Sequence, residues 1–305
     1  MRILISAASG LIGSAVSSAL TVDGHTVVRL VRRAPRGEAD EVRWDPAAGV
    51  LDSAAVVGFD AVVHLSGERI LGRWTAAKKA AIRASRVGST ALLARALAQS
   101  PRPPRAFVAA SAIGYYGDRG DEVLTEESPP GTDWLARLCA EWEAAAGPAA
   151  RRGIRVVHLR TGLALSRAGG ALARMLLPFR LGLGGPVGNG RQYWSWIAID
   201  DVVGAVRHLL ASPDVRGPVN LTAPQPVTSR EFARTLGHVL GRPALLPVPA
   251  FVLRLLFGEA ADAALLTGSR VAPTKLQASG YFFLYPHLEA ALRHVLGVGD
   301  MERRI

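Results

Sequence analysis

The sequence predicts an α/β fold built on a doubly wound parallel sheet. Short apolar runs, of the kind that buried parallel strands show, alternate along the chain with segments whose apolar residues recur at helical spacing. The chain has 305 residues, of which 49% are hydrophobic, and this is enough to bury a full core. We therefore expect one large α/β body, with or without a smaller appendage.

The first 31 residues fit this pattern in order. Residues 3–5 form a short apolar run, which small residues from position 6 to position 10 bring to an end. Apolar residues between positions 11 and 19 recur at helical spacing, Gly24 ends that helix, and residues 26–31 are typical of a second strand. The start of the chain is thus predicted to be a strand, a glycine turn, a helix and a strand.

The glycines of this turn have the spacing of a dinucleotide site. Gly10 lets the backbone approach a pyrophosphate, and Gly13 lets the new helix pack closely on the strand. The free N–H groups and the positive dipole end of the helix favour phosphate. The alternative is an ordinary strand, turn and helix without a ligand. The predicted cofactor contacts here are Ser9, Gly10, Leu11, Ile12 and Gly13.

The turn departs from the usual G-x-x-G-x-x-G pattern at its first position. Ala7 stands where that pattern has a glycine. An alanine predicts an ordinary negative φ at this point of the turn.

The end of the second strand indicates which dinucleotide is bound. Arg32 and Arg33 follow the strand, and the first acid after them is Glu38. An acidic residue here would hold the ribose 2′-hydroxyl of NAD, whereas arginine suits the 2′-phosphate of NADP, which a guanidinium binds with two hydrogen bonds. We therefore expect NADP(H), and the alternative is a pair of solvated loop arginines.

The net charge of +11 raises the question of a nucleic-acid partner. The basic residues are scattered along the chain and are almost all arginine, the only lysines being Lys78, Lys79 and Lys275. No basic run with interleaved aromatic residues occurs. The excess charge therefore indicates arginine usage and a pocket for anionic ligands, and we expect no nucleic-acid partner.

Cysteine usage and hydropathy limit the class of protein further. Cys139 is the only cysteine, which excludes a disulfide framework or a cysteine metal site within one chain, and no bound metal is expected. The longest apolar segment, residues 251–266, is interrupted by charged residues, so no membrane partner is expected. The first residues read as a strand and not as a signal peptide. We expect a cytoplasmic protein.

The rest of the chain continues the α/β rhythm and then loses it. Further strands are predicted after residue 60, at 105–110 and at 156–159, with a helix over 74–98 between the first two. The last third is less regular, with a glycine-rich loop at 182–190, predicted helices over 202–210 and 229–240, an apolar helix after Pro249 and a closing segment at 281–296.

Two structural units follow from this change in pattern. We place an NADP-binding domain at residues 1–165, with strands contributed from about residues 195–225. Residues 166–305 are predicted to form a smaller C-terminal α+β lobe on the substrate side.

Several motifs occur together along the whole length of the chain. They are SGLIG at 9–13, HLSGE at 64–68, RWT at 73–75, SR at 85–86, GYYG at 114–117, DWLARLCAEWEAAA from Asp133, the segment from Arg160 to Asp201, and LTAPQPVTSREFA from Leu221. With these motifs the chain resembles an atypical, epimerase-like family of extended short-chain dehydrogenases/reductases, whose members are also described as nucleoside-diphosphate-sugar epimerase or cell-division-inhibitor homologues.

The resemblance implies a Rossmann-like fold with a characteristic C-terminal domain, and NADP(H) as the cofactor. Besides the glycine turn and Arg33, it implies cofactor contacts from the turn after the third strand. It also implies that two further arginines face the cofactor side. The residues concerned are Leu65, Ser66, Gly67, Arg86 and Arg160.

Catalysis is less well defined by the sequence. Ordinary short-chain dehydrogenases use a Tyr and a Lys four residues later, and no Tyr-x-x-x-Lys occurs in this chain. Ser111 follows a predicted strand and matches the serine that hydrogen-bonds a substrate carbonyl, while Tyr115 and Tyr116 are candidates for the missing phenol. The alternatives are a structural turn serine and two packed aromatic residues.

Two functional classes therefore stay open. The first is an NADP(H)-dependent, epimerase-like oxidoreductase that acts on a small, polar or anionic substrate near Ser111, Tyr116, Arg180 and Gln192. The second is a catalytically silent NADP(H)-binding protein that senses the cofactor or serves a partner. The oligomeric state is left open, and a homodimer is one option.

Overall fold

The computed structural model describes residues 1–35 and 40–298. Within these ranges the largest sheet has eight strands in the order β12-β8-β6-β5-β1-β2-β3-β4, all parallel except for the antiparallel pair of β3 and β4. Their bounds are β1 Arg2–Ser6, β2 Thr26–Val31, β3 Glu41–Asp45, β4 Val50–Leu51, β5 Ala61–His64, β6 Ala106–Ala112, β8 Arg155–Thr161 and β12 Gly217–Leu221.

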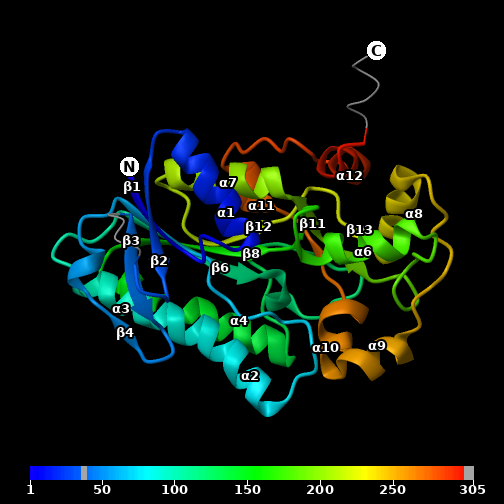
Figure 1. The fold of residues 1–305 in the computed structure, drawn as a ribbon, viewed down its shortest axis with the longest axis horizontal. Helices are drawn as coiled ribbons and strands as arrows, with labels where there is room; N and C mark the ends of the chain where they lie inside the picture. The colour runs from blue at the N-terminus through cyan, green and yellow to red at the C-terminus, as the bar shows by residue number, and fades with distance from the viewer. Residues whose placement is uncertain (36–39, 299–305) are drawn as a thin grey trace.

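Helices cover both faces of this sheet (Figure 1). Successive side chains of a strand point to opposite faces, so Ile3 and Ile5 of β1 enter one core while Leu4 enters the other. One core is closed by α1 Leu11–Val22, α7 Ile199–Ala211 and α11 Thr274–Ala278. The other face carries α3 Ser89–Gln99, α4 Trp134–Ala144 and α5 Gly147–Arg151.

The helix expected over residues 74–98 is interrupted. Residues Ala76–Arg83 form α2, Ala84–Gly88 form the π-helical turn η2, and α3 follows directly. A π turn accommodates an extra residue in a helix and is frequent at functional sites. Here it carries Ser85 and Arg86, whose side chains face the candidate site described below.

The C-terminal lobe has a core of its own. This core joins β9 Leu163–Leu165, α6 Gly170–Arg180, β10 Tyr193–Trp194, β11 Trp196–Ala198, β13 Val227–Thr228, α8 Ser229–Leu240 and α12 Leu288–Leu296. A smaller cluster holds α9 Ala250–Phe257, α10 Glu259–Ala261 and the π turn η4 Asp262–Leu266. The predicted Rossmann-like α/β fold with a smaller C-terminal lobe is confirmed.

The lobe is not continuous in sequence. Strand β12 and helix α7 return to the main body, where α7 packs beside α1, and α11 packs beneath β12. In the closing segment at 281–296, helix α12 covers Leu288–Leu296. The remaining elements are η1 Ala54–Val56, η3 Ile113–Tyr116 and the parallel pair of β7 Val123–Leu124 with β14 Arg270–Val271.

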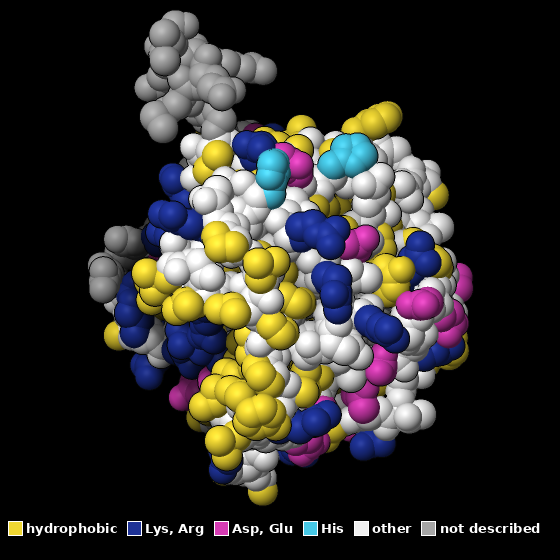
Figure 2. All heavy atoms as spheres, turned by 90° about the vertical axis from the view of Figure 1, so that its right-hand side faces the viewer, with side chains coloured by type: hydrophobic (Ala, Val, Ile, Leu, Met, Phe, Trp, Pro, Cys, Tyr) yellow, Lys and Arg dark blue, Asp and Glu magenta, His cyan; other side chains and the backbone are white. Residues whose placement is uncertain are grey.

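The far end of the lobe exposes many apolar side chains. Figure 2 shows them gathered on the lower half of the face that α9 and the preceding loop form, with basic side chains beside them. They include Leu245, Leu246, Phe251, Leu255 and Leu256.

Candidate functional site

A cavity of about 640 Å³ lies at the carboxyl ends of β1, β2 and β5. In this sheet β2 and β3 continue from β1 on one side while β5 and β6 continue on the other, so the crevice lies where the strand order reverses. Ligands of open α/β folds bind at such a switch point. Its lining comes from residues 7–10, 29–33 and 66–68, together with Glu41, Trp44, Pro46, Ser85 and Ser89.

The turn after β1 adopts a conformation that the sequence did not predict. Ala7 has a φ of 53°, so the expectation of a negative φ is wrong. The turn needs the left-handed conformation at this position, because the carbonyl of Ala7 must fold back to accept a hydrogen bond from the Gly10 N–H at 2.8 Å. The alanine keeps the conformation that glycine would adopt more easily.

The next glycine is required by close packing. A Cβ at Gly13 would lie 2.1 Å from the carbonyl oxygen of Ala7, which no real side chain tolerates. Helix α1 can therefore start directly against the end of β1. This close approach brings the first N–H groups of α1 to the crevice.

The start of α1 suits a phosphate group. Gly10 is the N-cap residue, and among the described residues no side chain caps this end or places an acid in its first turn. The N–H groups of Leu11, Ile12 and Gly13 come first in the helix, where no intrahelical partner exists. Ser9 and Gly10 line the cavity. An anion would satisfy these donors.

Both arginines after β2 line the same cavity. Arg33 is held by Glu41 of the neighbouring strand β3, with Nη1 donating to Oε2 at 2.8 Å and Nη2 donating to Oε1. The Glu41 side chain is 1% exposed, whereas that of Arg33 is 43% exposed. Sequence reasoning missed Glu41, because its pairing depends on the register of β2 and β3.

The floor of the cavity is a chain of hydroxyls around a buried histidine. Ser66 Oγ donates to Ser6 Oγ at 3.0 Å, and Ser6 Oγ lies 2.8 Å from His64 Nδ1. On the other side of the ring, Nε2 lies 3.2 Å from Ser89 Oγ. Burial lowers the pKa of His64 to about 3. The neutral imidazole holds the Ser6 hydroxyl in place. Because Ser6 Oγ also accepts from the Leu65 N–H, this contact fixes the turn at Leu65.

Arg86 lies between this cavity and a second one. Gly67 lines the first cavity, and the Arg86 guanidinium lines the second. The two are in close contact, because a Cβ added to Gly67 would lie 3.3 Å from the guanidinium. Arg86 is 8% exposed, and its guanidinium stands over the ring of Trp142. Within the described ranges it makes one hydrogen bond, which is long: it donates to the Ile82 carbonyl at 3.4 Å. Burial lowers the pKa of Arg86. A buried cation with so few partners suits a ligand oxygen.

The second cavity has a volume of about 270 Å³ and lies between the main body and the lobe. Residues from η3 and α4 form one side, and residues from α6, β10 and η4 form the other. Most of its lining is apolar, with Leu135, Leu138, Cys139, Trp142, Leu163, Met175, Trp194 and Leu265 among the larger side chains.

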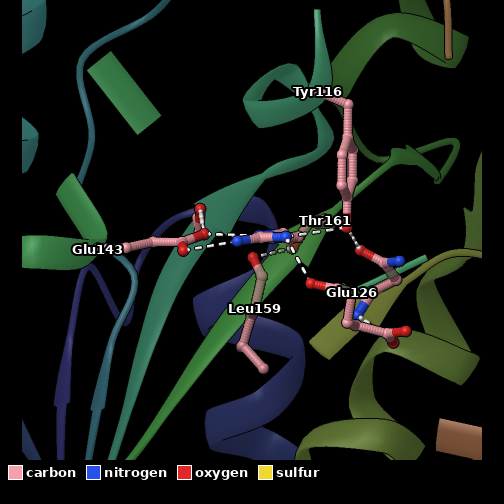
Figure 3. A network of polar contacts seen from close by, with 8 residues as sticks. Tyr116, Glu126, Glu143, Leu159 and Thr161 are labelled. Carbon is pink, nitrogen blue, oxygen red and sulfur yellow. Dashed lines mark hydrogen bonds and ion pairs between the residues drawn. The ribbon is translucent and has the colours of Figure 1, made fainter. Parts of the chain in front are cut away.

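Arg160 belongs to a buried polar network (Figure 3). Its Nε and Nη2 donate to the two carboxylate oxygens of Glu143 at 2.8 and 2.9 Å, and Nη1 donates to the Tyr116 hydroxyl at 3.0 Å. Although burial alone disfavours the charge, Glu143 raises the pKa of Arg160. The donors of Arg160 are thus used within the protein, and it lines neither cavity among those described. The cofactor contact expected of Arg160 stays a prediction.

The three residues expected to act in catalysis lie in or beside the same network. Ser111 Oγ donates to Glu143 at 2.7 Å, and the fully buried Tyr116 donates to Asn220 at 2.6 Å. The ring of Tyr115 lies 3.5 Å beneath the Arg160 guanidinium. Burial raises the pKa of Tyr116. None of the three lines either cavity in the part of the chain that the structure describes.

Helix α4 presents a cysteine to the second cavity. Cys139 and Glu143 are four residues apart on this helix, the spacing that a Tyr and a Lys have in ordinary short-chain dehydrogenases. Burial, together with Glu143, raises the pKa of Cys139 to about 12. The thiol is therefore neutral, and it contributes apolar surface to the cavity wall.

A family model described as the NAD dependent epimerase/dehydratase family matches residues 3–221. The chain belongs to this family. A second model, described as a domain of unknown function, DUF1731, matches residues 248–295. The resemblance found in the sequence, an epimerase-like family with its own C-terminal domain, is confirmed.

Relatives in this epimerase family match the chain along its whole length. The Epimerase family protein Mb2239 of Mycobacterium bovis is 44% identical over 291 residues, covering 95% of this chain and 96% of the relative. The human Epimerase family protein SDR39U1 is 39% identical over 303 residues, covering 97% and 100%.

Solved structures agree with the fold. The crystal structure of human SDR39U1, isoform 2, with NADPH has a TM-score of 0.88 and 38% identity, covering 97% of this chain and 99% of that one. A nucleoside-diphosphate sugar epimerase from Corynebacterium glutamicum has a TM-score of 0.82 and 35% identity, covering 100% of this chain and 60% of that one.

Two further observations concern metals and membranes. In residues 1–35 and 40–298, no three His, Cys, Asp or Glu side chains are grouped as metal ligands would be. Across the same part of the chain, none of the helices is both long and apolar enough to cross a membrane.

Proposed function

We propose that this protein is an NADP(H)-dependent oxidoreductase of the extended short-chain dehydrogenase type that acts on a small-molecule substrate. The observation that carries the proposal is the pair of cavities with Arg86 between them. The first has the volume and the phosphate-binding features of a dinucleotide site, and the second is of substrate size. The NADPH in the human relative supports the choice of cofactor.

The described residues fit NADP(H). The start of α1, with Ser9 and Gly10 beside it, would hold the pyrophosphate. Arg33 and Arg32 would hold the 2′-phosphate. Glu41 and the Ala34 carbonyl accept from Nη1 and from one N–H of Nη2 of Arg33, and Nε with the second N–H of Nη2 would donate two hydrogen bonds to the phosphate. The predicted contacts from Leu65, Ser66 and Gly67 stay part of the proposal, with the backbone of this turn fixed by Ser6.

Bound NADPH supplies a hydride to a substrate carbonyl carbon, and the carbonyl oxygen takes a proton, so that an alcohol and NADP⁺ result. Arg86 is placed to hold an oxygen at the boundary of the two cavities, where its N–H groups would stabilise developing negative charge. We assign the proton to solvent water, because the Ser111 and Tyr116 hydroxyls both donate within the buried network.

A second candidate function is a catalytically silent NADP(H)-binding protein that senses the cofactor or serves a partner. The same network favours it, since the chain has no Tyr-x-x-x-Lys and the hydroxyls of Ser111 and Tyr116 point to protein acceptors. Oxidation of NADPH by any carbonyl compound, dependent on Arg86, would exclude this candidate. Bound NADPH that never turns over would favour it.

The cofactor assignment is tested by titrating the protein with NADPH and NADH. We expect NADPH to bind more tightly, and Arg33→Ala to weaken NADPH about tenfold to a hundredfold because two charge-assisted hydrogen bonds are lost, while NADH is little affected. The matched control is Arg95→Ala, an exposed arginine of α3 that does not line the cavity. Equal affinities of the wild-type protein for both cofactors would contradict the assignment.

The compartment and assembly are also proposals. A single free thiol at Cys139, buried in the structure, is compatible with the reducing cytoplasm that we propose as the location. Light scattering of the purified protein distinguishes a monomer from the homodimer that we kept as an option.

A further inference from the structure

Several polar side chains around the second cavity donate their hydrogen bonds to the protein and not to the cavity. Thr161 Oγ1 donates to the Leu159 carbonyl at 3.2 Å, and Thr267 Oγ1 donates to the Asp262 carbonyl at 2.8 Å. The indole N–H of Trp142 donates to Thr90 Oγ1 at 2.9 Å, which leaves the ring to the cavity. The donor hydrogens of these lining groups are thus used within the protein.

Two serines of the lining repeat this pattern. Ser195 Oγ donates to the Ser269 carbonyl at 2.7 Å and accepts from the Val271 N–H at 2.9 Å. Ser269 Oγ donates to the Gly117 carbonyl at 2.7 Å. A sugar ring has several hydroxyls that each need a partner, and burying them against satisfied groups costs free energy. The cavity is therefore poorly suited to a sugar.

The charged residues of the lining lie at its edges. Arg86 stands at the boundary with the first cavity, against Gly67. Asp133 is exposed and caps α4, its Oδ1 accepting from the Ala136 N–H at 2.8 Å. Between these two, the walls consist mainly of Leu, Ile, Trp, Met and Ala side chains. One end of a bound molecule can thus meet a cation, and the rest meets apolar surface.

The volume limits the size of the ligand. A cavity of roughly 150 Å³ holds a benzene molecule. The second cavity, of about 270 Å³, has room for one ring with a short chain, and a nucleoside diphosphate joined to a sugar would extend beyond it.

We propose that the second cavity binds a small carbonyl compound with an apolar body and no phosphate group, in place of a nucleotide sugar. The inference rests on the proposed function, because the carbonyl is the group that NADPH would reduce. Arg86 receives the carbonyl oxygen, and the side chains of Leu135, Leu138, Trp142 and Met175 surround the body of the molecule. This departs from the polar or anionic substrate that the sequence suggested.

The test measures binding of three probes, cyclohexanone, acetophenone and UDP-glucose, by ligand-observed NMR with the full chain alone and with NADPH. We expect both ketones to bind and UDP-glucose to show no binding. A variant that fills the cavity, Ala171→Leu, is expected to weaken the ketones about tenfold or more. The same variant should leave NADPH affinity unchanged within about twofold, since Ala171 lines only the second cavity among those described.

The matched control changes the same helix outside the cavity. Leu177→Ala in α6 removes a side chain that is 68% exposed, and it should leave ketone binding as in the wild type. A second filling variant, Gly114→Ala, keeps the inference testable if Ala171→Leu fails to fold, because its new Cβ would have only ordinary contacts with Leu135 and Cys139.

The outcomes separate the substrate class from the cofactor. UDP-glucose binding that Ala171→Leu weakens would overturn the inference, and so would ketone binding that neither filling variant affects. Ketone binding to the chain without NADPH that is lost in the filling variants supports the inference about the second cavity, whether or not NADPH binds. Failure of NADPH to bind would instead overturn the proposed function.

Discussion

At the scale of single residues, the site depends on a few atoms held at close range. The left-handed Ala7 and the side-chain-free Gly13 bring α1 onto the end of β1, and buried His64 fixes the floor of the crevice. The sequence predicted the residues that lie close together along the chain in a known motif, namely Gly10, Gly13, Arg32 and Arg33. Glu41, Ser6 and Ser89 could not be predicted, because strand register and helix packing bring them there.

Gly13→Ala tests the close approach. Its Cβ would overlap the Ala7 carbonyl, so we expect a loss of about 2–3 kcal/mol in the free energy of unfolding and much weaker NADPH binding. The control, Gly88→Ala, adds a Cβ in a helical turn with nothing within 4 Å, and it should gain up to about 1 kcal/mol. Urea unfolding measures both, and equal effects of the two substitutions would contradict this explanation.

His64 predicts a pH dependence of stability. Its pKa is about 3 in the folded protein and about 6.5 when unfolded, so the unfolded chain binds one more proton between these values. The stability that neutral His64 provides is complete above pH 6.5 and is lost as the pH falls. Between pH 7 and pH 5 we expect a loss of about 2 kcal/mol from this residue.

The measurement is urea unfolding at both pH values for the wild type and His64→Gln. His64→Gln should lose the pH dependence of the free energy of unfolding that His64 contributes. His238 has a side chain that is 66% exposed, and His238→Gln should keep that pH dependence. If His64→Gln lost as much stability as the wild type between pH 7 and pH 5, His64 would not be the cause of the pH dependence.

At the scale of helices and strands, periodicity predicted regular elements well and irregular ones poorly. Helix α8 covers Ser229–Leu240 as expected, because a capping box starts it and a left-handed Gly241 ends it. The π turn at Ala84–Gly88 was not predicted, because an inserted residue leaves no mark in the composition of a helix. That turn changes the phase of the helix, and it carries Arg86 toward the boundary of the cavities.

The capping box of α8 can be tested by itself. Thr228 Oγ1 accepts from the Glu231 N–H at 3.2 Å, and Glu231 accepts from the Thr228 N–H at 2.7 Å. Thr228→Ala should reduce the free energy of unfolding by about 1 kcal/mol. Thr235→Ala changes a half-buried residue within the same helix whose hydroxyl donates only to the Glu231 carbonyl, and it should have little effect. A cost for Thr235→Ala as large as that for Thr228→Ala would contradict the capping role.

At the scale of the whole molecule, the fold places a cofactor crevice beside an apolar cavity. The parallel sheet and the place of the crevice at its strand ends follow from the βαβ pattern of the sequence, whereas the order of the strands was not predicted. The apolar cavity could not be predicted, because Trp142, Trp194 and Leu265 meet there from distant parts of the chain. The same is true of the Arg160 network, in which the hydroxyls of Ser111 and Tyr116, suggested for catalysis by the motifs alone, donate to Glu143 and Asn220.

The central claim is that the crevice at the ends of β1, β2 and β5 binds NADPH. A crystal structure of the complex tests it most directly. We predict the pyrophosphate at the start of α1, the 2′-phosphate within hydrogen-bonding distance of Arg33, and the nicotinamide facing the second cavity beside Arg86. NADPH bound elsewhere, or a 2′-phosphate that contacts neither Arg32 nor Arg33, would contradict the account.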